Sequence, residues 1–160
     1  MTAKDMFSIP TGPLSLTLAG LLPFFAGAGA ILFIAIRGET PDGAALALLV
    51  YAAVILSFLG GVRWGVEMTA EVLAGLRFSV LLLSVLGSIA GWALVLVWTL
   101  VHPAPWLFLI MAGALLAHWL WDVLSSSAMP AWFSGLRTIA SGGAVLSLCA
   151  AWAGLQFVAG

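Results

Sequence analysis

Five long apolar runs separated by short polar breaks occupy most of this chain of 160 residues. A helix of about 20 apolar residues crosses the roughly 30 Å hydrocarbon core of a bilayer, and each run is about that long. The runs are continuously apolar, without the alternation of a membrane β-strand. The pattern predicts an all-α membrane protein, a compact bundle of five transmembrane helices, over residues 13–36, 44–68, 78–101, 106–125 and 138–158.

The breaks between the runs carry residues that end helices. Residues 37–43 have turn chemistry, residues 102–105 contain prolines, and residues 126–137 contain Pro130 and Gly135. The first run exceeds the roughly 7 to 15 residues of a signal-peptide core, so we interpret it as a retained span. We expect residues 1–160 to form a single integral membrane domain, since no stretch is left for a soluble one.

The composition excludes a water-soluble fold and a nucleic-acid partner. Hydrophobic residues make up 64% of the chain and charged residues 7%, against about 25% charged residues in a soluble domain. The formal charge is -1, and no basic stripe is present to neutralise a phosphate backbone. Cys149 is the single cysteine, so no disulfide framework can form. The lipid bilayer is the predicted environment.

The distribution of basic residues predicts the orientation. Lys4, Arg77 and Arg137 fall on the N-terminal side of the five predicted spans, with Arg63 close to it, whereas Arg37 falls on the other side. By the positive-inside rule the N-terminus is cytoplasmic and the C-terminus is outside. In a mitochondrial membrane the same rule would place the N-terminus in the matrix.

Three ionisable residues lie inside the predicted spans: Arg63, His118 and Asp122, with Glu67 nearer the interface. The second and fourth spans run in the same direction, and Arg63 and Asp122 both lie close to the ends of their spans. A buried arginine normally needs a partner, so we expect an Arg63–Asp122 ion pair with His118 beside it. Glu67 competes for Arg63, because it lies four residues later on the same helix. An ion pair at this spacing is weaker when the basic residue precedes the acidic one.

This polar cluster has two interpretations. It either pins two helices together, or it forms a ligand or proton site in which His118 titrates. One histidine and one aspartate are too few for a metal site, and His102 and His118 lie about 24 Å apart along the helix axis, which excludes a haem held by both. Known catalytic motifs are absent, so we expect neither enzymatic activity nor a cofactor.

Small and aromatic residues indicate close helix packing. Ser57, Gly61 and Gly65 recur at every fourth position, which lets membrane helices approach one another within one bundle or in a homo-oligomer. Indole rings gather at membrane interfaces, and three tryptophans lie near predicted span ends. They are Trp98, Trp106 and Trp132. Four others lie deeper and either pack between helices or line a pocket. They are Trp64, Trp92, Trp119 and Trp121.

Two segments carry a family resemblance. The first ends in Ser-Phe-Leu-Gly-Gly-Val-Arg-Trp-Gly at Gly65, and the second is Pro-Ala-Trp-Phe-Ser-Gly-Leu-Arg at residues 130–137. With Asp122 between them, the chain resembles the family of uncharacterised multi-pass inner-membrane proteins that includes transmembrane protein 69, a domain of unknown function. The resemblance implies an inner-membrane location in bacteria or mitochondria and supplies no catalytic residues. These residues stand at its motif positions: Ser57, Gly60, Gly61, Trp64, Gly65, Asp122, Pro130, Trp132 and Arg137.

The sequence therefore predicts a non-catalytic integral membrane protein. We expect an accessory, assembly or structural partner of an energy-transducing inner-membrane complex, bound to another membrane protein or to copies of itself. The alternative is a small carrier or receptor for protons or for an amphipathic ligand such as a quinone, porphyrin or lipid. That alternative would use Arg63, His118 and Asp122 as a pocket.

Overall fold

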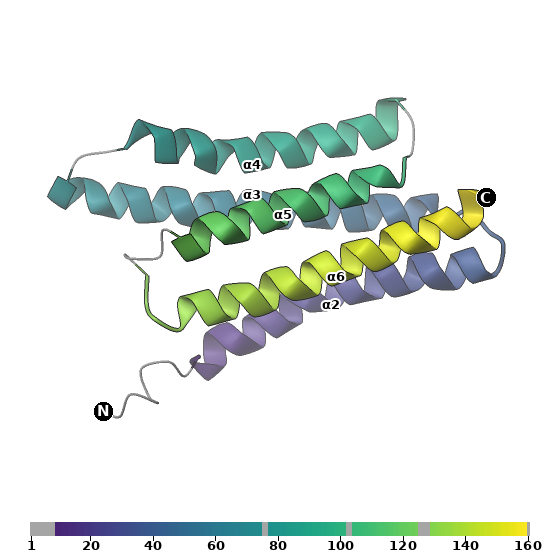
Figure 1. Cartoon of the computed structure of the whole chain (residues 1–160), viewed down its shortest axis with the longest axis horizontal. Coiled ribbons are helices and arrows are strands. Elements are labelled where there is room, and N and C mark those ends of the chain that lie inside the picture. The colour runs from purple at the N-terminus through teal and green to yellow at the C-terminus, as the bar shows by residue number, and fades with distance from the viewer. Residues whose placement is uncertain (1–8, 75–76, 102–103, 125–128, 160) are drawn as a thin grey trace.

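The computed structural model of the chain describes residues 9–74, 77–101, 104–124 and 129–159. Within these ranges the chain is mostly helical and forms the predicted bundle of five helices, each long and apolar enough to cross a membrane (Figure 1). The elements are α2 (Thr11–Ile36), α3 (Asp42–Ala74), α4 (Phe78–Leu96) with its π-helical continuation η1 (Val97–Val101), α5 (Trp106–Leu124) and α6 (Phe133–Ala159).

Successive helices run in opposite directions, so the start of α2 and the end of α6 lie at opposite ends of the bundle (Figure 1). Helix α2 packs along α6, α3 packs along α4, and α5 contacts both α6 and α3. Helix α4 is the least buried of the five. The site described below lies among the other four helices, at the end of the bundle where α2 begins.

Two helices extend beyond their predicted spans. Helix α3 continues past Met68 to Ala74, and α6 begins at Phe133 rather than at Thr138. The amide of Phe133 donates to the carbonyl of Pro130 at 2.9 Å, in the turn that leads from the proline into α6. Arg137 therefore lies inside a helix, where its charge is buried and paired, and the polar break before α6 is shorter than predicted. Lys4 and His102, used in the sequence interpretation, and the last residue of the predicted span 106–125 lie outside the described residues.

The connection between α2 and α3 is a helix-ending turn built on Gly38. Its φ is 73°, its amide donates to the carbonyl of Ala35 at 2.9 Å, and the amide of Glu39 reaches back to Ile34 at 3.3 Å. This is a Schellman arrangement, in which glycine accepts the left-handed conformation without a steric cost. The turn brings α3 back against α2, where the hydroxyl of Tyr51 donates to the carbonyl of Gly20 at 2.7 Å.

Close packing occurs between α3 and α4, where Ser57 of the predicted stripe meets Ser88, but Gly61 and Gly65 of that stripe face outward. A Cβ atom at Gly60 would overlap the backbone oxygen of Ser84, and one at Gly91 would lie 3.0 Å from Ala53. The two backbones therefore touch at glycine positions, as membrane helices do where lipid provides no hydrophobic drive.

Two tryptophans differ from the sequence interpretation. Trp98, expected at the membrane interface, is only 4% exposed and packs edge to face on Phe108, with ring centroids 5.7 Å apart. Trp92, expected to pack between helices or to line a pocket, is exposed on the outer face of α4. A count along the chain gives depth in the membrane but not the direction in which a helix face points. Trp119 links two helices by donating to the hydroxyl of Thr138 at 3.1 Å.

Candidate functional site

Asp122 is the centre of a buried polar cluster. Its Oδ2 lies 2.6 Å from Nε of Arg137 on α6 and 3.4 Å from Nδ1 of His118 one turn earlier on α5. Its Oδ1 lies 3.5 Å from Nε of Arg63 on α3. All four side chains are buried, so the carboxylate gathers three helices around one negative charge.

Arg63 has a second contact in this cluster. Its guanidinium lies over the ring of Trp121, with the central carbon 4.5 Å from the ring centroid. A guanidinium on an indole face is favoured by the ring quadrupole, and most strongly where water is excluded. The structure thus brings together Arg63, His118 and Asp122, the three residues that the sequence placed in one cluster.

Glu67, the fourth predicted member, belongs to a separate pair. Its carboxylate accepts hydrogen bonds from three groups of Arg77: the backbone amide at 2.7 Å, Nε at 3.1 and 3.2 Å, and Nη2 at 2.8 Å. Glu67 is buried, whereas the Arg77 side chain is mostly exposed. The carboxylate raises the pKa of the Arg77 guanidinium by hydrogen bonding and by its charge. This pair ties the end of α3 to the start of α4.

Arg137 is the cluster member that the sequence interpretation did not place beside Asp122. In the sequence, Arg137 falls in the polar break of residues 126–137 and on the N-terminal side of the predicted spans. One feature of the sequence could have indicated this contact. Two arginines, Arg63 and Arg137, lie at a depth similar to that of Asp122, so either could pair with its carboxylate. Extending α6 towards its N-terminus would also have placed Arg137 one turn from Ser141, on the same helix face.

The remaining motif residues hold helices together or face outward. Gly60 contacts α4, and the hydroxyl of Ser88 donates to that of Ser57 at 2.9 Å. Gly61 and Gly65 are exposed, and Cβ atoms there would meet nothing within 4 Å. Trp64 lies within α3 and is exposed, whereas Pro130 and Trp132 lie just before α6: the carbonyl of Pro130 accepts from the amide of Phe133, and Trp132 packs on the Phe133 ring.

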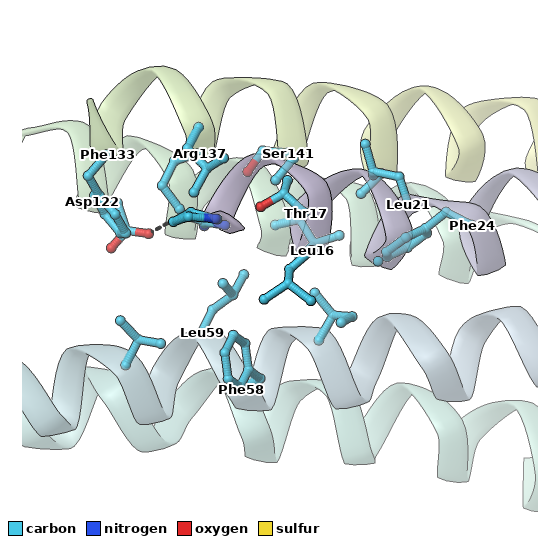
Figure 2. Close-up of a pocket in the computed structure, with 18 residues that line it drawn as sticks. Leu16, Thr17, Leu21, Phe24, Phe58, Leu59, Asp122, Phe133, Arg137 and Ser141 are labelled. Carbon is cyan, nitrogen blue, oxygen red and sulfur yellow. Dashed lines mark hydrogen bonds and ion pairs between the residues drawn. The ribbon is translucent and has the colours of Figure 1, made fainter. Parts of the chain in front are cut away.

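A cavity of 410 Å³ adjoins the cluster, bounded by α2, α3, α5 and α6. Asp122, Arg137 and Ser141 line one end of it together with Thr17 (Figure 2). Most of the remaining wall is apolar. These residues form it: Pro13, Leu16, Gly20, Leu21, Phe24, Ile55, Phe58, Leu59, Val62, Leu115, Phe133, Leu136, Ala140 and Ala144.

The cavity opens on the outer surface of the bundle between α2 and α3. Leu16 on α2 and Phe58 on α3 both line it, and they are 75% and 64% exposed. Figure 2 shows them facing one another across the cavity. The opposite end is closed by Phe24, which packs edge to face on Tyr51 with centroids 5.1 Å apart. The opening therefore faces the surroundings of the helices and is itself apolar.

Several buried polar atoms near this cavity lack a hydrogen-bond partner among the described residues. They include Nη2 of Arg137, Oγ of Ser141 and Nε2 of His118. Over the same ranges, no group of three or more histidine, cysteine, aspartate or glutamate side chains is placed to hold a metal ion. The chemistry that the cluster offers is ion pairing and hydrogen bonding.

The comparison with known proteins agrees with this architecture. Residues 9–153 match the family described as "Protein of unknown function (DUF3429)". The chain belongs to this family. The match covers all the helices that form the cavity except the last residues of α6 and includes the whole polar cluster. The expected resemblance to a multi-pass membrane family of unknown function is thereby confirmed.

A curated relative of this DUF3429 chain is Transmembrane protein 69 of Xenopus tropicalis. The two are 33% identical over 145 residues, which is 91% of this chain and 55% of that protein. The chain thus spans about half the length of the relative. Among solved structures, none is a significant match. The DUF3429 protein is accordingly a multi-pass membrane protein, and neither comparison indicates a catalytic activity.

Proposed function

We propose that this protein is a non-catalytic receptor or carrier that binds an amphipathic ligand in the cavity among α2, α3, α5 and α6. One observation carries the proposal: the cavity is polar at one end, apolar along most of its wall, and open at an apolar mouth between two membrane helices. Ligand sites commonly combine such an apolar wall with a few convergent polar groups.

The dimensions and the polarity of the cavity support this proposal. Along α2 its wall extends from Pro13 to Phe24, roughly 16 Å at 1.5 Å per residue. The polar end lies at the start of α2 and α6, and the apolar end lies towards the middle of these helices. A bound amphiphile would hold its polar group near the membrane interface and its tail towards the bilayer centre, as a lipid does.

The proposal can be tested by filling the cavity. Ala140 lines it, and the variant Ala140→Phe would occupy the space of a tail. Ala19→Phe is the matched control, because Ala19 is exposed on α2 and does not line the cavity. We expect native mass spectrometry from mild detergent to detect a retained small amphiphile on the wild-type protein and on Ala19→Phe, and its loss from Ala140→Phe.

Equal retention by both variants would contradict a ligand in this cavity. Loss from both, with unchanged helix content, would show that the amphiphile binds the outer surface of the bundle without using the cavity. Circular dichroism of each variant separates these results from a failure to fold.

The accessory role predicted from the sequence is the second candidate function. The observation that favours it is the outer face of α3, where Gly61 and Gly65 are exposed and would tolerate the close approach of another helix. The variant Gly61→Leu should then abolish the recovery of stoichiometric partner subunits with the tagged protein. Gly113→Leu is the control, since Gly113 is equally open on α5. Recovery of the protein alone would contradict this role.

We further propose that the described helices act as one integral membrane domain of the inner membrane, with the N-terminus cytoplasmic. Arg77 supports this orientation, because it directly precedes α4, which begins at the same end of the bundle as α2 (Figure 1), and its side chain is exposed. Reporter fusions to either terminus test it. A periplasmic reporter that is active at the N-terminus would reverse the orientation.

A further inference from the structure

The buried polar cluster carries an unbalanced charge. Arg63 and Arg137 each carry a positive charge, and Asp122 is the carboxylate that faces both. Glu67, the other buried carboxylate of the described residues, is engaged by Arg77. Two guanidinium groups therefore share one carboxylate at the end of the cavity, which leaves positive charge in excess. A buried charge is costly unless it is paired, so this end of the cavity favours an anion.

Two hydrogen-bonding groups at this end lie one turn apart on α6. Nη2 of Arg137 and Oγ of Ser141 have no partner in the described part of the chain, and their side chains are 6% and 4% exposed. Nε of Arg137 donates a hydrogen bond to Asp122, and Nη2 of the same guanidinium does not take part in it. Both residues line the cavity, and Figure 2 shows them on one side of it. A buried donor without a partner is destabilising, and an oxyanion at this end of the cavity would provide the missing acceptor.

From this geometry we infer that the cavity selects an oxyanionic amphiphile, with Arg137 and Ser141 binding the head group. The inference rests on the proposed function and adds the chemical class of the ligand. The guanidinium supplies a charge-assisted donor, and the hydroxyl supplies a second donor one helical turn away. Carboxylate and phosphate head groups share this chemistry. The apolar mouth at Leu16 and Phe58 admits the tail from the surrounding lipid.

The test compares two probes that differ only in the head group. Oleate and oleyl alcohol have the same tail, and binding of each to the purified protein is measured in neutral nanodiscs at a pH where oleate is ionised. We expect oleate to bind about ten-fold more tightly or better, because a hydrogen bond to a charged group is stronger than one to a neutral hydroxyl. Oleoyl phosphate should show the same preference. Sodium acetate and inorganic phosphate should not compete, because they lack the tail.

Variants of single residues identify the groups that bind the anionic head group. Ser141→Ala removes one hydroxyl from a position that tolerates the change, and it should weaken oleate several-fold while leaving oleyl alcohol unchanged. Arg137→Lys keeps the charge but replaces the planar guanidinium and its several donors with a single ammonium group, so it should reduce the preference for oleate further. Thr138→Ala is a control, because the Thr138 hydroxyl bonds Ser134 and Trp119 rather than lining the cavity.

The outcomes separate this inference from the proposed function. If wild type binds both probes equally, and Ala140→Phe abolishes both, the cavity binds amphiphiles but the anion preference is wrong. If neither probe binds, or if Ala140→Phe changes neither, the proposed function fails and this inference fails with it. Competition by acetate or phosphate alone would contradict an amphiphile and indicate a site for a free anion.

Discussion

Asp122 and Arg137 form the shortest ion pair among the described residues, 2.6 Å from Oδ2 to Nε, although one lies near the end of α5 and the other near the start of α6. The pair joins two successive helices at the end of the bundle where the cavity is polar. The same carboxylate also lies near Arg63 on α3, so one side chain connects three helices.

Removing the charge of Asp122 should be strongly destabilising. Asp122→Asn would leave the buried guanidinium groups of Arg63 and Arg137 without their carboxylate. Breaking a buried ion pair from one side costs about 3 to 5 kcal/mol, and we expect a loss of this size in the free energy of unfolding in detergent. Asp42→Asn is the control, because Asp42 is exposed in the first turn of α3. An acidic side chain there stabilises the helix through its dipole by about 0.3 to 1 kcal/mol, so only a small loss is expected. Equal losses would contradict a central role for Asp122.

A charge swap should fail to restore stability. Combining Arg63→Asp with Asp122→Arg would reproduce an isolated pair between α3 and α5, but an arginine at position 122 would lie beside Arg137. We expect the double variant to remain about as unstable as the less stable single variant, because the new contact is between like charges. Unfolding measurements on the three variants provide the check. Recovery to near wild type would show that Arg137 contributes little to the cluster.

The helical bundle could be predicted from the sequence because its cause is local. Each span must satisfy its own backbone hydrogen bonds in lipid, so a long apolar run is sufficient to indicate a helix. Depth in the membrane was predictable by counting residues, and it brought Arg63, His118 and Asp122 to a common level. Arg137 was placed at a similar level but in a polar break, because a charge next to Pro130 and Gly135 is typical of a loop.

The cavity could not be predicted, since it depends on how helix faces are rotated. Its wall is formed by residues such as Leu16 and Phe58, which resemble any lipid-facing residue in the sequence. Gly60 and Gly61 show the same limitation: they are adjacent in one motif, yet one touches α4 and the other faces outward. Small-residue spacing indicates close packing somewhere along a helix without giving the direction.

These adjacent glycines provide a matched pair of substitutions. Gly60→Ala would place a methyl group against the backbone oxygen of Ser84, so α3 and α4 must separate, and we expect a loss of about 1 to 3 kcal/mol in unfolding free energy. Gly61→Ala meets nothing within 4 Å and should be neutral or stabilising by up to about 1 kcal/mol, because alanine is the better helix former. Thermal unfolding of the two variants in one detergent tests this. A reversed order would show that α4 does not pack at Gly60.

The contact between Tyr51 and Gly20 should make a small but measurable contribution to stability. Tyr51 is the single tyrosine of the chain, and its hydroxyl donates at 2.7 Å to the Gly20 carbonyl, in the turn before Pro23. Tyr51→Phe keeps the ring against Phe24 and removes only this bond, so we expect a loss of about 0.5 to 1.5 kcal/mol in unfolding free energy. Ser15→Ala is the control, because the Ser15 hydroxyl bonds a carbonyl of its own helix at an exposed position and should contribute close to nothing. Since Gly20 and Phe24 both line the cavity, the loosened contact should also weaken retention of its ligand. An unchanged stability of Tyr51→Phe, or a loss no greater than that of Ser15→Ala, would show that α2 is held against α3 by apolar packing alone.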